Sequence, residues 1–334
     1  MKVLFDHSSP FLLAHGGFQI QIEQTRAALK QVGVEVDFLR WWDDGQAGDI
    51  IHYFGRPFTS YVDLAHRKSI KVVFTALHSS LGIRSAWKRR AQKALIRTAE
   101  KVLPSFLERL SWESYRAADA CIALTPWEAQ LVREMFDAPP DKVYVVPNGV
   151  EEVFFAPRMA PSGKWLVTTA SILPVKRIVE TARAAVLAET PYWVIGKPMG
   201  ENEAYYRDYS ELCRANPKIL RYEGPIADRA KLAEVYREAR GFILLSDWES
   251  LSISALEAAA AQCPLLLSDL PWARTAFGDQ ASYCPTGSST NATAESLRQF
   301  YANAVTLKPP EKPKRWVEVA QQLKAIYESL LTTS

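Results

Sequence analysis

Two carboxylates, separated by seven residues, frame the start of one predicted helix. Glu249 follows the apolar run 241–245, which predicts a buried strand, and Glu257 lies two turns into the alanine-rich segment that comes next. The first turn of a helix has free backbone N–H groups and a partial positive charge, which suit a diphosphate. Carboxylates beside it can accept hydrogen bonds from sugar hydroxyls. Ordinary capping, with Ser250, Ser252 and Ser254 as candidate N-cap residues, is the alternative explanation of this segment.

Basic residues stand at the start of a second predicted helix. Lys176 and Arg177 come after the apolar run 165–170, a predicted strand. An ammonium group at this point could balance the negative charge of a leaving diphosphate. A solvated lysine at a helix start is the alternative.

The first predicted strand, 2–6, leads to a pair of glycines, Gly16 and Gly17. Glycines that open a helix let a ligand approach bare backbone N–H groups, although a simple turn explains them equally well. The spacing G-x-G-x-x-G does not follow this strand, and the phosphate-binding spacing G-x-x-x-x-G-K-S/T does not occur. The sequence therefore disfavours a dehydrogenase and a P-loop kinase.

Three further side chains could contact a sugar. His78, after the predicted strand 70–76, could hydrogen-bond a sugar or the reacting centre, or it could be a satisfied structural histidine. Trp41 and Trp42 follow a predicted strand and precede Asp43-Asp44, so they could offer an aromatic face and carboxylates to an acceptor sugar. Core packing of at least one tryptophan is the alternative.

The elements that must position these residues are short apolar runs that alternate with segments of helical periodicity. Continuous apolar runs favour strands buried on both faces, which predicts parallel sheets covered by helices on each side. The predicted strands are 2–6, 34–39, 49–54, 70–76, 119–124 and 143–146, followed by 165–170, 192–195, 219–222, 241–245, 264–267 and 281–284. The segment 315–331 has the apolar spacing of a helix buried along one stripe. Ligands of such sheets bind at the carboxyl ends of the strands.

Length and composition support two globular domains. The chain has 334 residues, more than one core usually supports, and it is 48% hydrophobic and 23% charged. The net charge of +3 is too small to indicate a nucleic-acid partner. The four dispersed cysteines predict buried thiols rather than a disulfide scaffold or a zinc site. With no signal-peptide pattern and no apolar run of about 18 residues, we expect a cytoplasmic protein without a membrane span.

Taken in order, these motifs resemble the retaining glycosyltransferases of family four, which have the GT-B fold. Their acidic signature is Glu, seven residues, Glu, here Glu249 and Glu257. The other matching features, in chain order, are Gly16-Gly17, His78, 118–125, 146–150, 173–177, 194–196 and 222–224. The resemblance covers nearly the whole chain. It implies an α/β protein with two Rossmann-like domains facing a central cleft and a C-terminal helix that crosses back to the first domain.

The resemblance also implies a role for each domain. Residues 1–155, with the helix 315–334, would bind the acceptor, and residues 160–312 would bind the nucleotide-sugar donor. By analogy, Glu257 holds the ribose hydroxyls, Glu249 lies near the transferred sugar and Lys176 meets the diphosphate. The expected catalytic residues are His78, Glu249 and Lys176. The other expected donor-binding residues are Gly16, Gly17, Ser171, Arg177, Gly196, Tyr222, Leu251 and Ser252. The expected acceptor-binding residues are Trp41 and Trp42.

The sequence departs from the family at two of these positions. Ser171 stands where the family usually has an arginine, and Arg177 stands where it more often has a glycine. Loss of a cation would weaken stabilisation of the leaving group unless Arg177 replaces it.

The implied reaction moves a hexose-type sugar from a nucleotide diphosphate sugar to an acceptor hydroxyl of a glycan, a lipid-linked molecule or a small molecule. The family uses a front-face mechanism, so we expect no metal and no bound cofactor. A non-catalytic sugar-nucleotide or glycan-binding relative and a sugar-nucleotide epimerase of related fold are the alternatives. The nucleotide base, the donor sugar, the acceptor, the linkage and the oligomeric state stay open.

One segment, 85–105, concentrates basic charge. Six basic residues stand there against one acid, and Arg89, Lys93, Arg97 and Lys101 form one stripe at helical spacing. A modest apolar stripe accompanies them, as in helices that lie on membranes. We expect peripheral contact with the inner face of a membrane or an anionic, lipid-linked acceptor. A solvated helix that packs on the first domain is the alternative.

Overall fold

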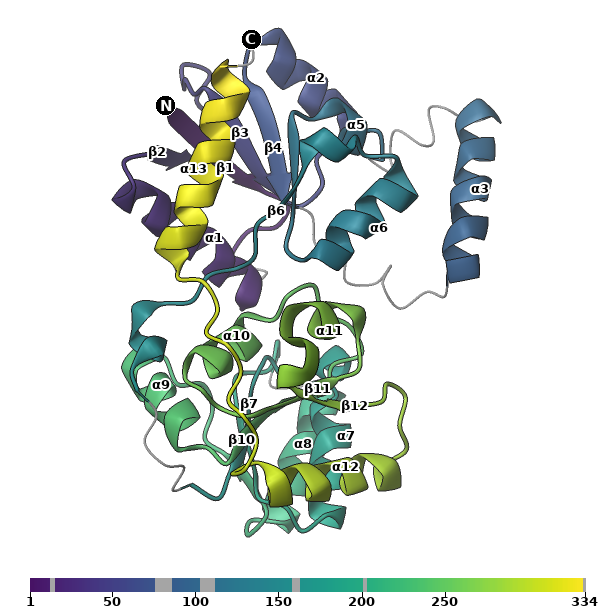
Figure 1. The fold of residues 1–334 in the computed structure, drawn as a ribbon, viewed down its shortest axis with the longest axis vertical. Coiled ribbons are helices and arrows are strands. Elements are labelled where there is room, and N and C mark those ends of the chain that lie inside the picture. The colour runs from purple at the N-terminus through teal and green to yellow at the C-terminus, as the bar shows by residue number, and fades with distance from the viewer. Residues whose placement is uncertain (13–15, 76–85, 103–111, 158–162, 201–202, 333–334) are drawn as a thin grey trace. The chain divides into compact units, whose positions relative to one another are not determined.

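The computed structural model describes residues 1–12, 16–75, 86–102, 112–157, 163–200 and 203–332, which form two compact units. Unit 1 comprises Met1–Gly149 and Lys314–Ser334, and unit 2 comprises Val150–Pro313 (Figure 1). Residues 150–155, which the sequence analysis placed in the first domain, belong to unit 2. The physical reason is the 3-10 turn Glu152–Phe155, which packs against two helices of unit 2 and buries Phe154 there.

Unit 1 is built on a six-stranded sheet in which every pair of neighbours is parallel. The order is β2-β1-β3-β4-β5-β6. The strands are β1 (Lys2–His7), β2 (Glu35–Phe38), β3 (Ile50–Phe54), β4 (Lys71–Thr75), β5 (Ala120–Ala123) and β6 (Val143–Val145). Each of the six runs predicted from the sequence forms a strand.

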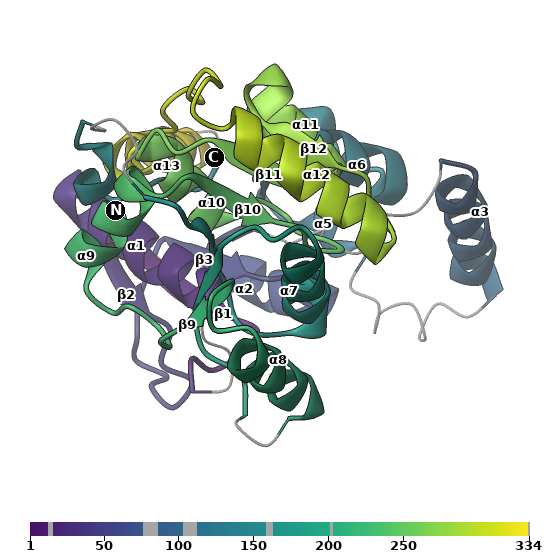
Figure 2. The ribbon, with the colours of Figure 1, turned by 90° about the horizontal axis from the view of Figure 1, so that it is seen from below.

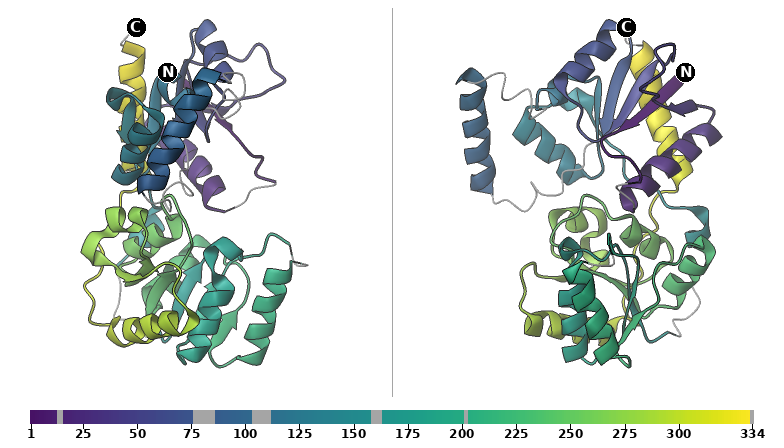
Figure 3. Two further views of the ribbon diagram at one scale, coloured as in Figure 1. Left: turned by 90° about the vertical axis from the view of Figure 1, so that its right-hand side faces the viewer. Right: turned by 180° about the vertical axis from the view of Figure 1, so that it is seen from behind.

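The helices of unit 1 are α1 (Gly17–Gln31), α2 (Thr59–Arg67), α3 (Ala86–Val102), α5 (Ser114–Ala117), α6 (Pro126–Phe136) and α13 (Trp316–Thr332). They pack around this sheet, except α3, which packs against the helix α6 (Figure 1). The predicted C-terminal helix is confirmed as α13, whose buried stripe includes Val319, Leu323 and Tyr327. It packs against α1, and Figures 1 and 3 show the yellow α13 beside the purple α1. The chain therefore returns to unit 1 after unit 2 is complete.

Unit 2 repeats this architecture. Its strands are also all parallel, in the order β12-β11-β10-β7-β8-β9. They are β7 (Leu166–Thr169), β8 (Tyr192–Ile195), β9 (Leu220–Tyr222), β10 (Gly241–Leu244), β11 (Leu265–Ser268) and β12 (Ser282–Cys284). All six match predicted runs, so the prediction of two Rossmann-like α/β domains is confirmed.

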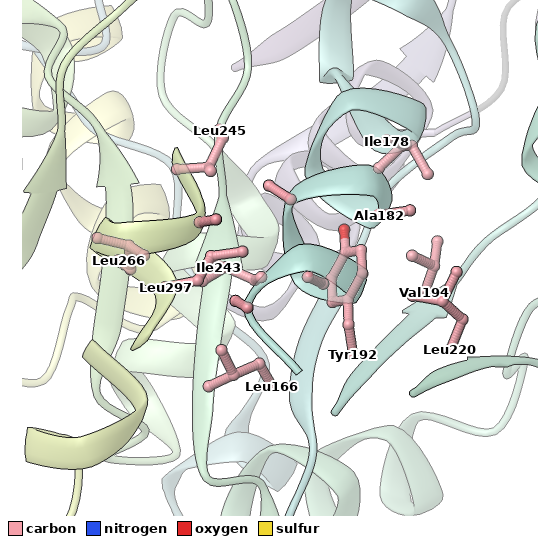
Figure 4. Packing of buried hydrophobic residues seen from close by; sticks show 14 of the residues in the cluster. Leu166, Ile178, Ala182, Tyr192, Val194, Leu220, Ile243, Leu245, Leu266 and Leu297 are labelled. Carbon is pink, nitrogen blue, oxygen red and sulfur yellow. The ribbon is translucent and has the colours of Figure 1, made fainter. Parts of the chain in front are cut away.

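Helices cover both faces of the second sheet. They are α7 (Ile178–Leu187), α8 (Ala204–Ala215), α9 (Arg229–Glu238), α10 (Ile253–Ala260), α11 (Pro271–Phe277) and α12 (Thr290–Asn303). On one face α7 lies between α12 and α8 (Figure 2), and its side chains pack with Leu166, Tyr192 and Ile243 of the sheet (Figure 4). On the other face Phe242 meets Tyr236 of α9. Because helices bury both faces of the sheet, its strands are nearly continuous apolar runs in the sequence.

The described part of the chain carries no disulfide. All four cysteines have free thiols, and Cys121, Cys263 and Cys284 are buried. Within the described ranges, no helix combines the length and the apolar character needed to cross a membrane.

Candidate functional site

The candidate site of unit 2 begins where β7 and β10 end. These two strands are parallel neighbours, so the loops that follow them leave the same edge of the sheet. Lys176, in the 3-10 turn Pro174–Lys176, contacts Oε1 of Glu249 with its Nζ atom. The hydroxyl of Ser246 donates to the same carboxylate oxygen at 3.0 Å. The predicted cation and the first predicted carboxylate thus lie in direct contact, although 73 residues separate them in the chain.

Arg177 adopts an unusual backbone conformation immediately after Lys176. Its φ of 51° lies in the left-handed region, which glycine adopts most easily. This conformation explains why the family more often has glycine at this position. The guanidinium Nε atom lies 3.7 Å from Oδ1 of Asp247, and an Nη2 donor reaches the carbonyl oxygen of Ser288 at 3.4 Å. Arg177 is therefore engaged with Asp247, while Lys176 is engaged with Glu249.

The start of α10 lies directly after this loop. Ser252 is its N-cap, and its hydroxyl accepts a hydrogen bond from the backbone N–H of Ala255 at 3.3 Å. The capping role that the sequence allowed for Ser252 is therefore real. Leu251 and Ser250 are buried beside it, and the Ser250 hydroxyl has no hydrogen-bond partner in the described part of the chain. A buried hydroxyl without a partner is costly, and a ligand or a water molecule would satisfy it.

Glu257 lies on α10 at the centre of an ion-pair network. Its buried carboxylate contacts Arg229 through Oε1, and Tyr236 donates to Oε2 at 3.4 Å. Arg229 also binds Oε2 of Glu151, with its Nη2 atom at 2.6 Å, and its guanidinium lies over the ring of Phe154. Burial raises the pKa of Glu257 to about 7, while the positive charge of Arg229 opposes that rise. This carboxylate therefore titrates near neutral pH.

The residues that surround Glu257 escaped the sequence analysis. Arg229 and Glu151 are 78 residues apart, and Arg229 and Glu257 are 28 residues apart, so no local spacing relates them. The one available signal was Asp228, which caps α9 by accepting from the N–H groups of Ala230 and Lys231 and so fixes where that helix begins.

The remaining predicted donor residues of unit 2 lie at neighbouring strand ends. Gly196 follows β8 and packs closely against the loop after β7. A Cβ atom added at this position would lie 1.9 Å from the carbonyl oxygen of Ala170, so only glycine fits here. The Tyr222 hydroxyl, at the end of β9, donates to the carbonyl oxygen of Gly196 at 3.1 Å. Ser171 is half-buried in the loop after β7. The carboxyl edge of this sheet therefore carries the predicted donor residues of unit 2.

The other predicted residues belong to unit 1. Gly16, with a φ of 113°, precedes α1, and Gly17 is its first residue. Trp41 and Trp42 are 79% and 83% exposed, so the core-packing alternative is wrong for both. The Trp41 Nε1 group donates to Asp6 at 3.3 Å, which places that ring at the end of β1. His78 lies outside the described residues.

A buried carboxylate at the end of β1 was also missed. Asp6 is 5% exposed, accepts from the Tyr61 hydroxyl at 2.7 Å, and is the residue that meets Trp41. Its carboxylate and the hydroxyl of Tyr61 add polar groups to the predicted acceptor region. Asp6 directly follows the apolar residues Val3, Leu4 and Phe5 within the same strand, and a carboxylate at that point was the available signal.

Two residues of the basic stripe predicted on segment 85–105 form ion pairs within unit 1. Within α3, Lys93 lies 2.6 Å from Oδ1 of Asp137, and Arg97 lies 3.0 Å from Oδ2 of the same residue. Asp137 is the left-handed C-cap of α6, where lysine and arginine are also attracted by the negative end of the helix dipole. Half of the stripe therefore holds α3 against α6.

No group of three or more His, Cys, Asp or Glu side chains suited to a metal ion occurs within the described ranges. The adjacent Asp43 and Asp44 do not form one, and Asp43 pairs with Arg40 at 2.7 Å.

Two family models match the chain and together cover most of it. The model described as Glycosyl transferases group 1 matches residues 152–323, and Glycosyltransferase Family 4 matches residues 36–153. The first match spans more than half of the chain and contains Lys176, Glu249 and Glu257. The resemblance recognised in the sequence is confirmed.

Curated relatives and solved structures agree with these matches. A D-inositol 3-phosphate glycosyltransferase of Kineococcus radiotolerans is 28% identical over 229 residues, which is 62% of this chain and 49% of that protein. A protein of the same name from Actinosynnema mirum is 31% identical over 170 residues, 45% of this chain and 40% of that one. The chain thus spans about half the length of the curated relatives that it matches.

Among solved structures, the sucrose-phosphate synthase of Thermosynechococcus elongatus superposes with a TM-score of 0.70 at 17% identity over 100% of both chains. Anabaena Alr3699/HepE in complex with UDP and glucose gives a TM-score of 0.67 at 10% identity, over 98% of this chain and 99% of that one. Both show the same fold, and the predicted GT-B fold class is confirmed.

Proposed function

The chain belongs to the glycosyl transferases group 1 family, a family of enzymes, and on that premise we propose that it is a retaining glycosyltransferase. It moves a hexose-type sugar from a nucleotide diphosphate sugar to an acceptor hydroxyl. The observation that carries the proposal is the contact between Lys176 and Glu249 at the adjacent ends of β7 and β10. A cation held on a carboxylate beside a helix N-terminus suits a site that receives a diphosphate and a sugar.

The positive charge for the leaving group comes from the chain's own groups. Lys176 moves part of its hydrogen bonding from Glu249 to the diphosphate, and the backbone of Leu251 and Ser252, at the N-terminus of α10, faces the sugar and the phosphate. The donor therefore needs no metal and no bound cofactor. Gly16 and Gly17 offer further backbone N–H groups from the loop after β1.

Glu257 serves as the acceptor for the ribose hydroxyls. A carboxylate has about four lone-pair sites, so Glu257 can accept from the nucleotide while it keeps its contact with Arg229. Arg229 favours the ionised form of Glu257 and thus keeps those sites available. Tyr222 and Gly196 border the same strand ends and would limit which base enters.

The reaction follows a front-face course. Departure of the nucleoside diphosphate leaves an oxocarbenium-like centre, and the acceptor hydroxyl attacks it from the same face while its proton passes to the leaving phosphate. Glu249, and His78 by family analogy, orient the donor sugar near that centre. Trp41 and Trp42 of unit 1 supply an apolar surface for the acceptor.

The names of the similar proteins guide the choice of probes. The Anabaena structure contains UDP, and the curated relatives are named D-inositol 3-phosphate glycosyltransferases. Calorimetry with UDP, GDP and ADP tests the donor site. Turnover of the matching nucleotide sugars, with and without inositol phosphates and glycan acceptors, tests the reaction. Acceptor-dependent transfer with retained anomeric configuration is the expected result, and donor turnover that needs no acceptor would indicate the epimerase instead.

One observation favours a second candidate, a non-catalytic sugar-nucleotide or glycan-binding protein. Ser171 replaces a cation that the family usually has, and Arg177 is engaged with Asp247 and Ser288. Nucleotide binding without turnover on any acceptor pool would select this candidate. The variant Ser171→Arg should then restore measurable transfer.

A further inference from the structure

The helix α3 has one side docked and one side exposed. Its docked side carries Lys93 and Arg97, which bind Asp137, and Ile96, which is buried. Residues in a helix are 100° apart, so the opposite side carries Trp87, Ala91, Ala94 and Leu95. The docked residues account for how α3 attaches to unit 1, and they leave the opposite side without a function in the fold.

The exposed side is apolar at its centre. Trp87 is 67% exposed and Leu95 is 70% exposed, and the alanines between them are exposed as well. Large apolar side chains gathered on one exposed surface usually mark an interaction site. Lys88 and Arg90 are exposed at the borders of this surface, and the Lys88 ammonium lies 5.7 Å from the centre of the Trp87 ring. We call these six residues, Trp87, Lys88, Arg90, Ala91, Ala94 and Leu95, the outer face of α3.

The charge of α3 identifies the partner. Between residues 86 and 102 the helix has six basic residues and one acid, Glu100. An apolar centre with a basic border fits a bilayer with anionic headgroups, because tryptophan and leucine enter the boundary of the acyl chains while the cations stay among the phosphates. A nucleic acid would use the cations but would leave Leu95 exposed to water.

We propose that the outer face of α3 docks the protein on the surface of an anionic membrane. The docking residues all belong to unit 1, and none takes part in the donor site of unit 2. The proposal therefore stands independently of the reaction proposed above. The contacts also identify which basic residues matter, since Lys93 and Arg97 are held by Asp137 while Lys88 and Arg90 are exposed at the borders of the outer face.

The test is co-sedimentation of the full chain with vesicles at low salt. One set of vesicles contains phosphatidylcholine alone, and the other contains phosphatidylcholine with phosphatidylglycerol. The unaltered protein should pellet with the anionic vesicles and stay in the supernatant with the neutral ones. Lys88→Glu/Arg90→Glu and Trp87→Ser/Leu95→Ser should each lower the partition coefficient for anionic vesicles by about tenfold or more.

Matched controls come from α2, where exposed residues of the same types lie on another surface. Arg67→Glu/Lys68→Glu makes the same charge change, and Leu64→Ser removes a side chain that is 61% exposed. Both should bind vesicles within about twofold of the unaltered protein. Unchanged melting temperatures and unchanged UDP affinity for all four variants would show that the effects belong to the membrane surface alone.

Three outcomes would overturn the proposal. The first is equal recovery in the supernatant with both lipid compositions. The second is an equal loss of binding in the α2 charge control, which would mean that net charge alone governs the result. The third is unimpaired vesicle binding by Trp87→Ser/Leu95→Ser together with tighter binding to a DNA duplex, which would make α3 a surface for polyanions.

Discussion

The Nδ1 atom of His52 lies 2.6 Å from the hydroxyl oxygen of Tyr327, which joins strand β3 to the last helix of the chain. The other ring nitrogen, Nε2, lies 2.8 Å from the hydroxyl of Thr75 on the neighbouring strand β4. The imidazole is fully buried, and burial lowers the pKa of His52 to about 3. This histidine therefore stays neutral at physiological pH and acts as a polar link between α13 and the sheet of unit 1.

Acid should destabilise unit 1 through His52. The folded-state pKa lies below the ordinary value of about 6.5, so the unfolded chain binds the proton more tightly. The contribution of His52 to stability is complete above about pH 6.5 and is lost as the pH falls toward about 3, by at most about 1.4 kcal/mol per pH unit. Urea unfolding between pH 7.5 and 5 should show this slope, and His52→Gln should flatten it. An unchanged slope in that variant would contradict the assignment.

Removing charge from the donor site should weaken nucleotide binding. Lys176→Ala deletes the cation at the diphosphate, and Glu257→Ala deletes the ribose partner. Loss of a charged hydrogen-bond partner costs about 1.5–3 kcal/mol, so the Kd for the nucleoside diphosphate should rise about 10- to 150-fold in each variant. Calorimetry measures this Kd. Lys231→Ala and Glu234→Ala, on the exposed side of α9, are matched controls that should leave the Kd unchanged. Unchanged affinity in both folded site variants would disprove the donor site.

The affinity for the nucleoside diphosphate should also depend on Arg229. Because burial raises the pKa of Glu257 to about 7 and Arg229 opposes that rise, Arg229→Leu should raise this pKa further. At pH 7 the variant would then hold a protonated Glu257 and bind the nucleotide more weakly, and it would recover affinity as the pH rises toward 9. In the unaltered protein the affinity should fall below about pH 7. Glu257→Gln should lack both pH effects, which separates them from titration of the phosphate.

Trp41 and Trp42 should affect the acceptor alone. Alanine at the tryptophan that contacts the acceptor should raise the acceptor KM several-fold through loss of stacking area, while the donor affinity stays the same. Since both rings are largely exposed, Trp42→Ala should leave the melting temperature within about 2 °C. A lower melting temperature without a change in acceptor KM would assign the rings a structural role.

The sequence predicted the strands well because burial on both faces leaves a direct pattern. The run Lys71–Thr75, for example, has three consecutive apolar residues, Val72, Val73 and Phe74, at its centre. The apolar stripe of α13 was predicted equally well, since Val319, Leu323 and Tyr327 recur at the helical period. Such patterns record the local environment of consecutive residues.

Contacts between residues that are distant in the sequence produce no such local pattern. The network of Glu257, Arg229 and Glu151 joins three segments of unit 2. The sequence singled out Glu257, but Arg229 and Glu151 each resemble an ordinary surface charge when taken alone. The orientation of α3 was misjudged for the same reason. The helical period separates its basic stripe from its apolar side, but only Asp137, 44 residues beyond Lys93, decides which side is docked.

The return of the chain to unit 1 sets an order of events during protein synthesis. The strands of unit 1 leave the ribosome first, and α13 follows only after the roughly 160 residues of unit 2 have been made. At about 5–20 residues per second this delay lasts roughly 10 to 30 seconds. During that interval the nascent sheet lacks the helix that supplies Tyr327 to His52, so unit 2 can fold before unit 1 is closed. The first unit to be translated is thus the last to be completed.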